Sequence, residues 1–225
     1  MDDFLYVIKR SPLFYGLRDD EIPTMLQCLA AEQRIFQAGE SIFRMGQAAT
    51  DFAMIVKGRG QVIRENFWGG EEGYEILEPG SLFGQEFACA QATVLPVGLI
   101  ALEECEAVFM EYKRMINVCS LACGFHNRLL QNMLRILADQ TVWMDRTIRH
   151  MSQKTIREKL LSYLSEEAVR HGSPSFEVPF NRKELAEYLA VDRSAMSSEL
   201  GRLQKEGFLE VTRNRFVLKL NDRTR

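Results

Sequence analysis

Between residues 33 and 102 the chain alternates short apolar runs with glycines, and this pattern constrains the fold more than any other feature. The runs are rich in Ile, Val, Phe and Tyr, and no segment with helical periodicity lies between them. Short runs spaced by turn residues are typical of antiparallel strands that close into a barrel or jelly roll. We therefore predict an antiparallel β-roll. Its predicted strands are Arg34–Phe36, Ser41–Phe43, Phe52–Val56, Gln61–Ile63, Tyr74–Leu77, Ser81–Phe83 and Thr93–Leu102.

Helical periodicity appears on both sides of these runs. Before residue 30, Leu and Ile recur at helical intervals that prolines and a glycine interrupt, which predicts a lead-in of short helices. After the roll, Glu106–Tyr112 is predicted to form one or two helical turns. A long helix is then predicted from Met115 to Trp143.

The predicted long helix carries two apolar rows. One row has spacings of four and three residues, close to a heptad seam, and includes the polar residues Asn132 and Gln140. We predict that this row meets a second copy of the chain, while a second row (Leu121, Leu130, Leu134 and Leu137) faces the roll. The alternative is that both rows are buried within one monomer. The predicted dimerisation residues are Val118, Ala122, Phe125, Leu129, Asn132 and Ile136.

Charge divides the chain into two unlike parts. Residues 1–144 contain 12 Lys and Arg against 19 Asp and Glu, a net charge of −7, whereas residues 145–225 contain 16 against 12, a net charge of +4. This asymmetry is expected when one module senses or dimerises and the other approaches a polyanion. The predicted class is α+β, with the roll and its helical lead-in at 1–114, the long helix that is predicted to dimerise at 115–144 and the basic segment at 145–225.

Composition also bears on the compartment. The apolar stretches are too short for a bilayer span, and the sequence starts Met1-Asp2-Asp3 without the basic residues of a secretory signal. The expected localisation is cytoplasmic. The five cysteines form no regular CxxC motif, so we expect thiols rather than a disulfide framework.

The segment from Asn181 to Gly207 has the pattern of two short helices joined by a tight turn. Asn181 and Asp192 are suited to cap the two helices, and Gly207 is suited to end the second. A hairpin with two arginines at its tip follows, so the unit is predicted to be a winged helix-turn-helix. The alternative is an interaction domain that never touches DNA. The predicted DNA contacts are Arg182, Arg193, Ser194, Ser197, Ser198, Arg202, Arg213 and Arg215.

Several motifs together resemble one known family. They are Ser11-Pro12-Leu13-Phe14 with Gly16-Leu17, the turns Ala38-Gly39-Glu40 and Lys57-Gly58-Arg59-Gly60, the segment Pro79-Gly80-Ser81-Leu82-Phe83-Gly84, and the unit from Asn181 to Gly207. Across residues 10–220 the chain resembles the Crp/Fnr family of bacterial transcription regulators. The resemblance implies a homodimer with an effector-binding roll, and it implies double-stranded DNA and RNA polymerase as partners.

The chain departs from the cyclic-nucleotide-binding members of that family. Those members carry a Glu for the ribose after the glycine that matches Gly84, and an Arg for the phosphate further along. Gln85 stands at the Glu position here, and no Arg lies between residues 65 and 112, a stretch with ten Glu. A buried phosphate would therefore lack a counter-charge, and we predict an uncharged or weakly acidic effector instead. The predicted effector residues are Phe83, Gly84, Gln85, Glu86, Thr93 and Leu95, with Arg128 as the nearest cation if the long helix closes the site.

Other chemistries have weaker signals. Cys119, Cys123 and His126 leave a redox or metal role open, although we predict no metal site and name no cofactor. The rival function is a jelly-roll ligand-binding or enzymatic protein whose last domain mediates protein contacts. Residues 1–125 contain no histidine, and the chain has no G-x-S-x-G motif and no phosphate-cradling loop. We therefore predict that the protein is not an enzyme.

Overall fold

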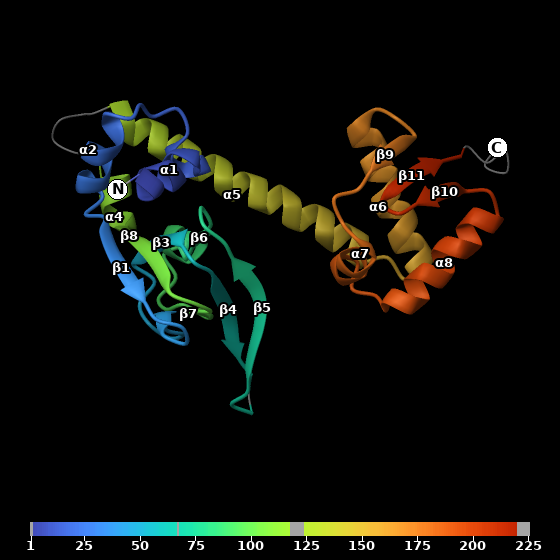
Figure 1. The fold of residues 1–225 in the computed structure, drawn as a ribbon, viewed down its shortest axis with the longest axis horizontal. Coiled ribbons are helices and arrows are strands. Elements are labelled where there is room, and N and C mark those ends of the chain that lie inside the picture. The colour runs from blue at the N-terminus through green and yellow to red at the C-terminus, as the bar shows by residue number, and fades with distance from the viewer. Residues whose placement is uncertain (1, 67, 118–123, 220–225) are drawn as a thin grey trace. The chain divides into compact units, whose positions relative to one another are not determined.

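The computed structural model describes residues 2–66, 68–117 and 124–219. Internal contacts divide the chain into two compact units, one ending at Ala138 and one beginning at Asp139, and each is described by itself. The first unit combines a β-roll with a helical lead-in, and the second contains helices and a small sheet (Figure 1). The predicted α+β class is confirmed.

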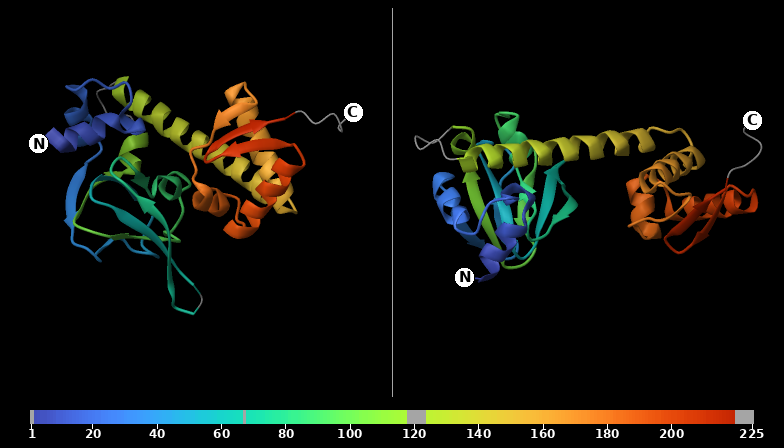
Figure 2. Two further views of the ribbon diagram at one scale, coloured as in Figure 1. Left: turned by 45° about the vertical axis from the view of Figure 1, so that its right-hand side comes forward. Right: turned by 90° about the horizontal axis from the view of Figure 1, so that it is seen from above.

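Two four-stranded antiparallel sheets form the roll, as the glycine-punctuated runs predict. The first has the strand order β1-β8-β3-β6 and the second the order β2-β7-β4-β5. The hairpin of β4 and β5 extends beyond the neighbouring strands of the roll (Figures 1 and 2). The strands are β1 (Glu32–Phe36), β2 (Ser41–Phe43), β3 (Asp51–Lys57), β4 (Gly60–Glu65), β5 (Glu71–Leu77), β6 (Leu82–Phe83), β7 (Gly98–Ala101) and β8 (Cys105–Glu111).

The central strands β3 and β8 of the first sheet are buried on both faces, whereas its edge strand β1 is exposed. In β3, Ala53 and Ile55 join the core between the two sheets, whereas Phe52, Met54 and Val56 join a second core on the other face. Side chains alternate across a strand, so an uninterrupted apolar run is what a strand between two cores requires.

The second core is closed by helices from both ends of the first unit. It combines residues from α1 (Asp2–Arg10), the 3₁₀ turn η1 (Pro12–Phe14), α2 (Glu21–Cys28), α4 (Tyr112–Ile116) and the long helix α5 (Gly124–Met151) with the outer face of the first sheet. Within the described ranges, no helix has both the length and the apolar character needed to cross a membrane.

Four boundaries differ from the sequence predictions. The predicted strand Thr93–Leu102 is only β7, Gly98–Ala101. Cys105–Glu111 is a central strand rather than a helical turn, because it is buried on both faces and shows no alternation. A short helix, α3 (Gln85–Cys89), interrupts the roll strands, where none was predicted. The predicted long helix is α4 followed by α5, and α5 ends at Met151, eight residues beyond Trp143.

The second unit is a winged helix-turn-helix, as predicted. Asn181 caps α7 with a capping box: its side chain accepts a hydrogen bond from the backbone N–H of Glu184, and the Glu184 side chain accepts one from the backbone N–H of Asn181. Thr155 and Glu158 form the same capping box at the start of α6. Thirteen buried residues form its core. The elements are α6 (Ile156–His171), β9 (Ser175–Glu177), α7 (Arg182–Tyr188), α8 (Arg193–Lys205), β10 (Leu209–Thr212) and β11 (Arg215–Leu218), with the three strands in the order β10-β11-β9.

Candidate nucleic-acid interface and effector cavity

Helix α8 has one buried and one exposed face. Asp192 caps it by accepting a hydrogen bond from the backbone N–H of Ala195 at 2.7 Å. Met196, Leu200 and Leu203 fix the helix to the core of the second unit, each at most 3% exposed. The opposite face is exposed and carries Arg193, Ser194, Ser197 and Ser198. These are four of the predicted DNA contacts, and their small side chains allow a close approach to a duplex.

The predicted DNA contacts differ in the interactions that their side chains make within the protein. Arg202 pairs with Glu199 (Nη1 to Oε2, 3.3 Å), and Arg215 donates to Ser175 Oγ at 3.3 Å. Ser197 donates its hydroxyl to the Arg193 carbonyl at 2.9 Å. Arg193 itself is exposed at the first turn of the helix, and it has no hydrogen bond or ion pair from its side chain among the described residues.

A cavity of about 550 Å³ lies between the start of α7 and the wing. The guanidinium of Arg182 lies 5.3 Å from the ring centroid of Phe216, and burial lowers its pKa from the ordinary arginine value. Arg213 enters the cavity from the wing turn, where its φ of 56° is left-handed. Two guanidinium groups on one cavity suit a phosphate oxygen. Pro179, Phe180, Asn181, Glu184 and Asn214 complete the lining, and the sequence analysis did not single them out as contacts.

The predicted effector residues do not all share one environment. Phe83 and Leu95 belong to the core between the sheets, and the ring centroid of Phe83 lies 5.1 Å from that of Phe43. Glu86 and Thr93 are exposed. Gly84 adopts a φ of +87°, and a Cβ there would lie 3.3 Å from the Asp51 carbonyl oxygen, so the turn before α3 requires glycine.

Gln85 is the most unusual of these residues. Its side chain is 2% exposed, and its Oε1 has no hydrogen-bond partner among the described residues. Leaving a buried acceptor unpaired costs about 1–3 kcal/mol, so such an atom marks a place where a partner is missing.

Arg128 does not supply the roll with a cation. Its guanidinium donates to the Gly16 carbonyl in the lead-in, and its side chain packs over that glycine. The sequence makes Arg128 the nearest cation if the long helix closes the effector site, but its guanidinium is instead bonded to the lead-in. Helix α5 packs against the lead-in on the side that carries Arg128, and the hydrogen bond to Gly16 keeps the Arg128 guanidinium at the lead-in.

A cavity of about 450 Å³ in the roll is lined by Arg64 and Glu72, by Tyr74, and by Pro96 and Val97. It lies between the β4–β5 hairpin and the loop before β7. Arg64 immediately precedes the stretch of the sequence that lacks basic residues, and the sequence analysis overlooked it. The alternation of Gly60, Val62 and Arg64 along one face of β4 is the signal that reveals it.

Carboxylates surround this cavity. Burial, followed by the negative charges of Glu75 and Glu86, raises the pKa of Tyr74, whereas the charge of Arg64 lowers it. Burial and the charge of Glu75 raise the pKa of Glu86. The start of α3 and the β4–β5 hairpin therefore share one electrostatic environment.

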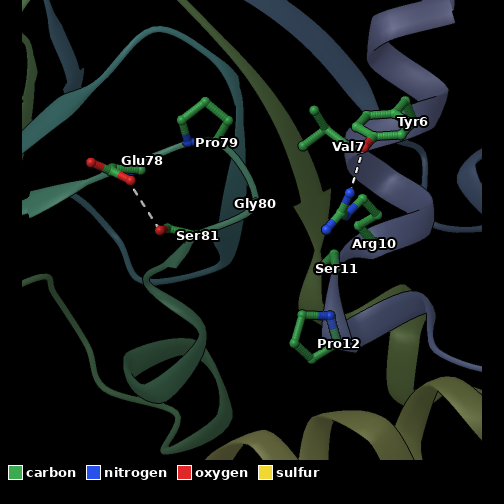
Figure 3. Close-up of a pocket in the computed structure, with 9 residues that line it drawn as sticks. All are labelled: Tyr6, Val7, Arg10, Ser11, Pro12, Glu78, Pro79, Gly80 and Ser81. Atoms are coloured by element: carbon green, nitrogen blue, oxygen red, sulfur yellow. Dashed lines mark hydrogen bonds between the residues drawn. The ribbon is translucent and has the colours of Figure 1, made fainter. Parts of the chain in front are cut away.

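A second cavity in the first unit, of about 530 Å³, separates α1 from the turn between β5 and β6 (Figure 3). Two hydrogen bonds join polar groups of its lining to one another. Arg10 donates to the Tyr6 hydroxyl, and the hydroxyl of Ser81 accepts from the backbone N–H of Glu78. This cavity therefore offers a ligand fewer unpaired groups than the one at Arg64.

The predicted dimer seam on α5 is partly turned inward. Leu129 is fully buried, and Asn132 donates to the carbonyls of Leu13 and Tyr15 at 2.8 and 2.9 Å. Ile136 packs against the same core. Leu129 and Asn132 are therefore used for packing within one chain, because the lead-in covers them. Ile136 is only partly buried, and Gln140 of the same row is exposed. Val118, Ala122 and the side chain of Phe125 lie outside the described residues.

Of the other predicted row of α5, only Leu134 is exposed among the described residues, and the row continues with exposed residues further along the helix. Leu134 is 67% exposed, and Met144 and Ile148 are 55% and 63% exposed. Together with Leu130, Leu137, Thr141 and Met151 they repeat at intervals of four and three residues. We call these seven residues the outer row. Leu130 and Leu137 are partly buried against the second core. An apolar heptad row exposed on a helix is typical of a coiled-coil seam.

The suggested metal or redox role of the cysteines receives no support. Cys119 and Cys123 lie outside the described residues. Within the described residues, no three Cys, His, Asp or Glu side chains are grouped so as to hold a metal ion. Burial, followed by the charges of Glu103 and Glu106, raises the pKa of the Cys105 thiol to about 11.

Two family descriptions match the chain. Residues 33–121 match the cyclic nucleotide-binding domain, and residues 158–225 match the Crp-like helix-turn-helix domain. The cyclic AMP receptor protein of Thermus thermophilus is 26% identical over 208 residues, which cover 91% of this chain and 90% of that protein. The transcriptional activator protein FnrA of Stutzerimonas stutzeri is 22% identical over 204 residues, covering 88% and 80%.

A solved structure is similar over nearly the full length. The Thermus thermophilus catabolite activator protein is 21% identical, with a TM-score of 0.51 and coverage of 93% of this chain and 94% of that one. At this identity the likeness shows a shared fold.

Proposed function

Because the chain belongs to the Crp/Fnr family of transcription regulators, we propose that it acts as a homodimer on a roughly palindromic DNA site under the control of a small molecule bound in the roll. The family establishes a regulator with an effector-binding module and a DNA-binding module. The dimer, the class of effector and contact with RNA polymerase are proposals, and we propose regulation rather than catalysis as the activity.

The exposed face of α8 carries the DNA part of the proposal. In helix-turn-helix proteins the N-terminal residues of the second helix meet base edges in the major groove. Arg193 is the cation at this position, and bidentate contact from arginine to guanine is the commonest specific contact. The cavity lined by Arg182 and Arg213 suits the neighbouring phosphates, because both guanidinium groups reach it.

The outer row of α5 supports the homodimer. A C2 dimer uses the same patch on both chains, and a heptad row on one helix is complementary to its own copy. Two α8 helices related in this way are expected about 34 Å apart, one turn of duplex. The operator is then expected to contain two half-sites with that spacing.

Selection of bound sequences from a random duplex pool tests this proposal. The purified full-length protein is expected to enrich an inverted repeat, and binding should weaken steeply as salt rises because phosphates are neutralised. Selection that enriches no sequence would refute the proposal that the protein is a sequence-specific DNA-binding regulator. Enrichment of a single half-site would refute the dimer.

The effector is proposed not to be a cyclic nucleotide. Gln85 replaces the family's ribose-binding Glu and is buried, and no Arg or Lys lies between residues 65 and 112. Calorimetry with cyclic AMP and cyclic GMP is expected to show no binding to the roll. Micromolar affinity for either nucleotide would overturn this part of the proposal.

A further inference from the structure

We propose that the cavity between the β4–β5 hairpin and the loop before β7 binds a small aromatic carboxylic acid, whose carboxylate pairs with Arg64. The inference rests on the proposed control of the roll by a small molecule and narrows that molecule to one chemical class. It places the counter-charge on β4, outside the segment where nucleotide-binding relatives keep theirs.

The position of Arg64 in β4 is the first argument. Gly60 and Val62 lie on the inner face of β4, and Val62 is 3% exposed in the core between the sheets. Because residues two apart share a face, Arg64 continues this inner row beyond the end of the core. Its side chain lines the cavity at the mouth of the roll.

The exposed side chain of Arg64 also has no hydrogen-bond or ion-pair partner among the described residues. Glu72 is opposite Arg64 in the strand register, yet the two side chains form no ion pair. Two other arginines of the roll are paired, Arg59 with Glu103 at 2.9 Å and Arg34 with Glu32 at 2.5 Å. Arg44, on the loop after β2, has no side-chain partner among the described residues, but it does not line this cavity. A guanidinium presents a fork of donors that matches a carboxylate, so the unpaired group suits an organic acid.

The rest of the cavity fits an aromatic body. Val62 pairs with Glu75 and Ile63 with Gly73, so Tyr74 is the extra residue of a β-bulge. Bulges re-aim side chains next to binding sites, and Tyr74 lines the cavity together with Pro96 and Val97. A ring placed there has one aromatic and two aliphatic surfaces to contact. A cavity of about 450 Å³ holds a ligand of one or two rings.

The surrounding charge disfavours a ligand with two negative charges more than a ligand with one. Glu72 lines the cavity with Arg64, and Glu75 and Glu86 act on Tyr74 from nearby. Arg64 offers one local cation, and the three carboxylates around it repel each further negative charge on a ligand. A phosphate monoester, with about two charges at neutral pH, is therefore disfavoured relative to a carboxylate.

Calorimetry with phenylacetate and its uncharged amide, phenylacetamide, tests the ligand class on the full-length protein. Phenylacetate is expected to bind, and the amide is expected to bind at least about tenfold more weakly, because a charge-assisted hydrogen bond is worth roughly a factor of ten or more. Benzoate and indole-3-acetate extend the range of ring size. The absence of binding by all three acids would overturn the proposal.

Variants at Arg64 test the site. Arg64→Gln is expected to reduce the affinity for phenylacetate about tenfold or more, and Arg64→Lys to retain part of it, because lysine keeps the charge but not the fork. Arg59→Gln is the matched control, since it removes a nearby exposed arginine that is already paired, and it should leave the affinity unchanged. Circular dichroism verifies that each variant is folded.

The outcomes separate this inference from the wider proposal. Binding of phenylacetate that Arg64→Gln leaves intact would refute the site. Binding of cyclic AMP that Arg64→Gln abolishes would identify the cavity as a nucleotide site and refute the aromatic-acid class. Selection of an operator in the DNA experiment, with no acid bound, would refute this inference alone and leave the regulator proposal standing.

Discussion

At the residue scale, the arginines of the second unit differ in the ring contacts and ion pairs that their side chains make within the protein. Arg182 rests on the Phe216 ring, Arg202 pairs with Glu199, and Arg193 has no such partner. We propose that Arg193, at the start of α8, reads base edges and that Arg213, at the wing turn, contacts phosphates. The two kinds of contact have different experimental signatures.

Arg193→Ala is expected to cost about 1–3 kcal/mol on the selected operator and to relax the preference for one base pair. Arg213→Ala should weaken binding to all sequences alike and reduce the slope of log affinity against log salt by about one. Titration of operator and scrambled duplexes at several salt concentrations measures both effects. Equal losses on operator and scrambled DNA for Arg193→Ala would contradict its assignment to base reading.

At the element scale, His150 connects the last turn of α5 to α6. Its ring is 2% exposed, its Nδ1 is 2.9 Å from Ser162 Oγ and its Nε2 is 3.4 Å from Glu166 Oε2. Arg146 and Arg149 also pair with Glu166, at 3.0 and 3.6 Å. Burial lowers the pKa of His150, and the nearby arginines act in the same direction against the opposing charges of Glu166 and Glu167.

The second unit is therefore expected to lose stability in mild acid. The unfolded His150 takes up a proton near pH 6.5 and the folded one only at lower pH, so its stabilising contribution is complete above about pH 6.5 and declines as the pH falls through the folded-state pKa. Denaturant unfolding of a Trp68→Phe variant, followed by Trp143 fluorescence, reports on this unit. His150→Gln should flatten the pH dependence between pH 7.5 and 5. Identical slopes with and without His150 would refute the assignment.

At the scale of the whole molecule, the outer row of α5 is the surface that a second copy is proposed to cover. A lone chain leaves Leu134, Met144 and Ile148 more than half exposed, while Leu129 and Asn132 serve the internal packing. Residues that one chain has already buried do not contribute to a dimer.

Leu134→Asp is expected to convert the dimer to a monomer and to abolish tight operator binding, because it places a charge in an apolar seam. Val142→Asp is the matched control: Val142 is 49% exposed on the same helix but lies outside the outer row. Sedimentation velocity measures the oligomeric state of both variants. An unchanged dimer for Leu134→Asp, or a monomer for Val142→Asp, would refute this seam.

The sequence by itself determined the features that depend on neighbours along the chain. The caps Asn181 and Asp192 satisfy amides within three residues of themselves, so the helix-turn-helix was predicted with its boundaries. The glycine-punctuated runs likewise predicted the roll strands, because turns are local.

Only the tertiary structure decided which faces are covered. Cys105–Glu111 is a strand because both of its faces meet distant residues, and this burial removes the alternation that would identify it. The two rows of α5 are both apolar, and packing of the lead-in against Leu129 selects the inner one. Arg64 became a candidate site residue only when Tyr74 and Val97 were brought beside it. Burial depends on contacts between segments far apart in the chain, and the local periodicity of the sequence does not predict those contacts.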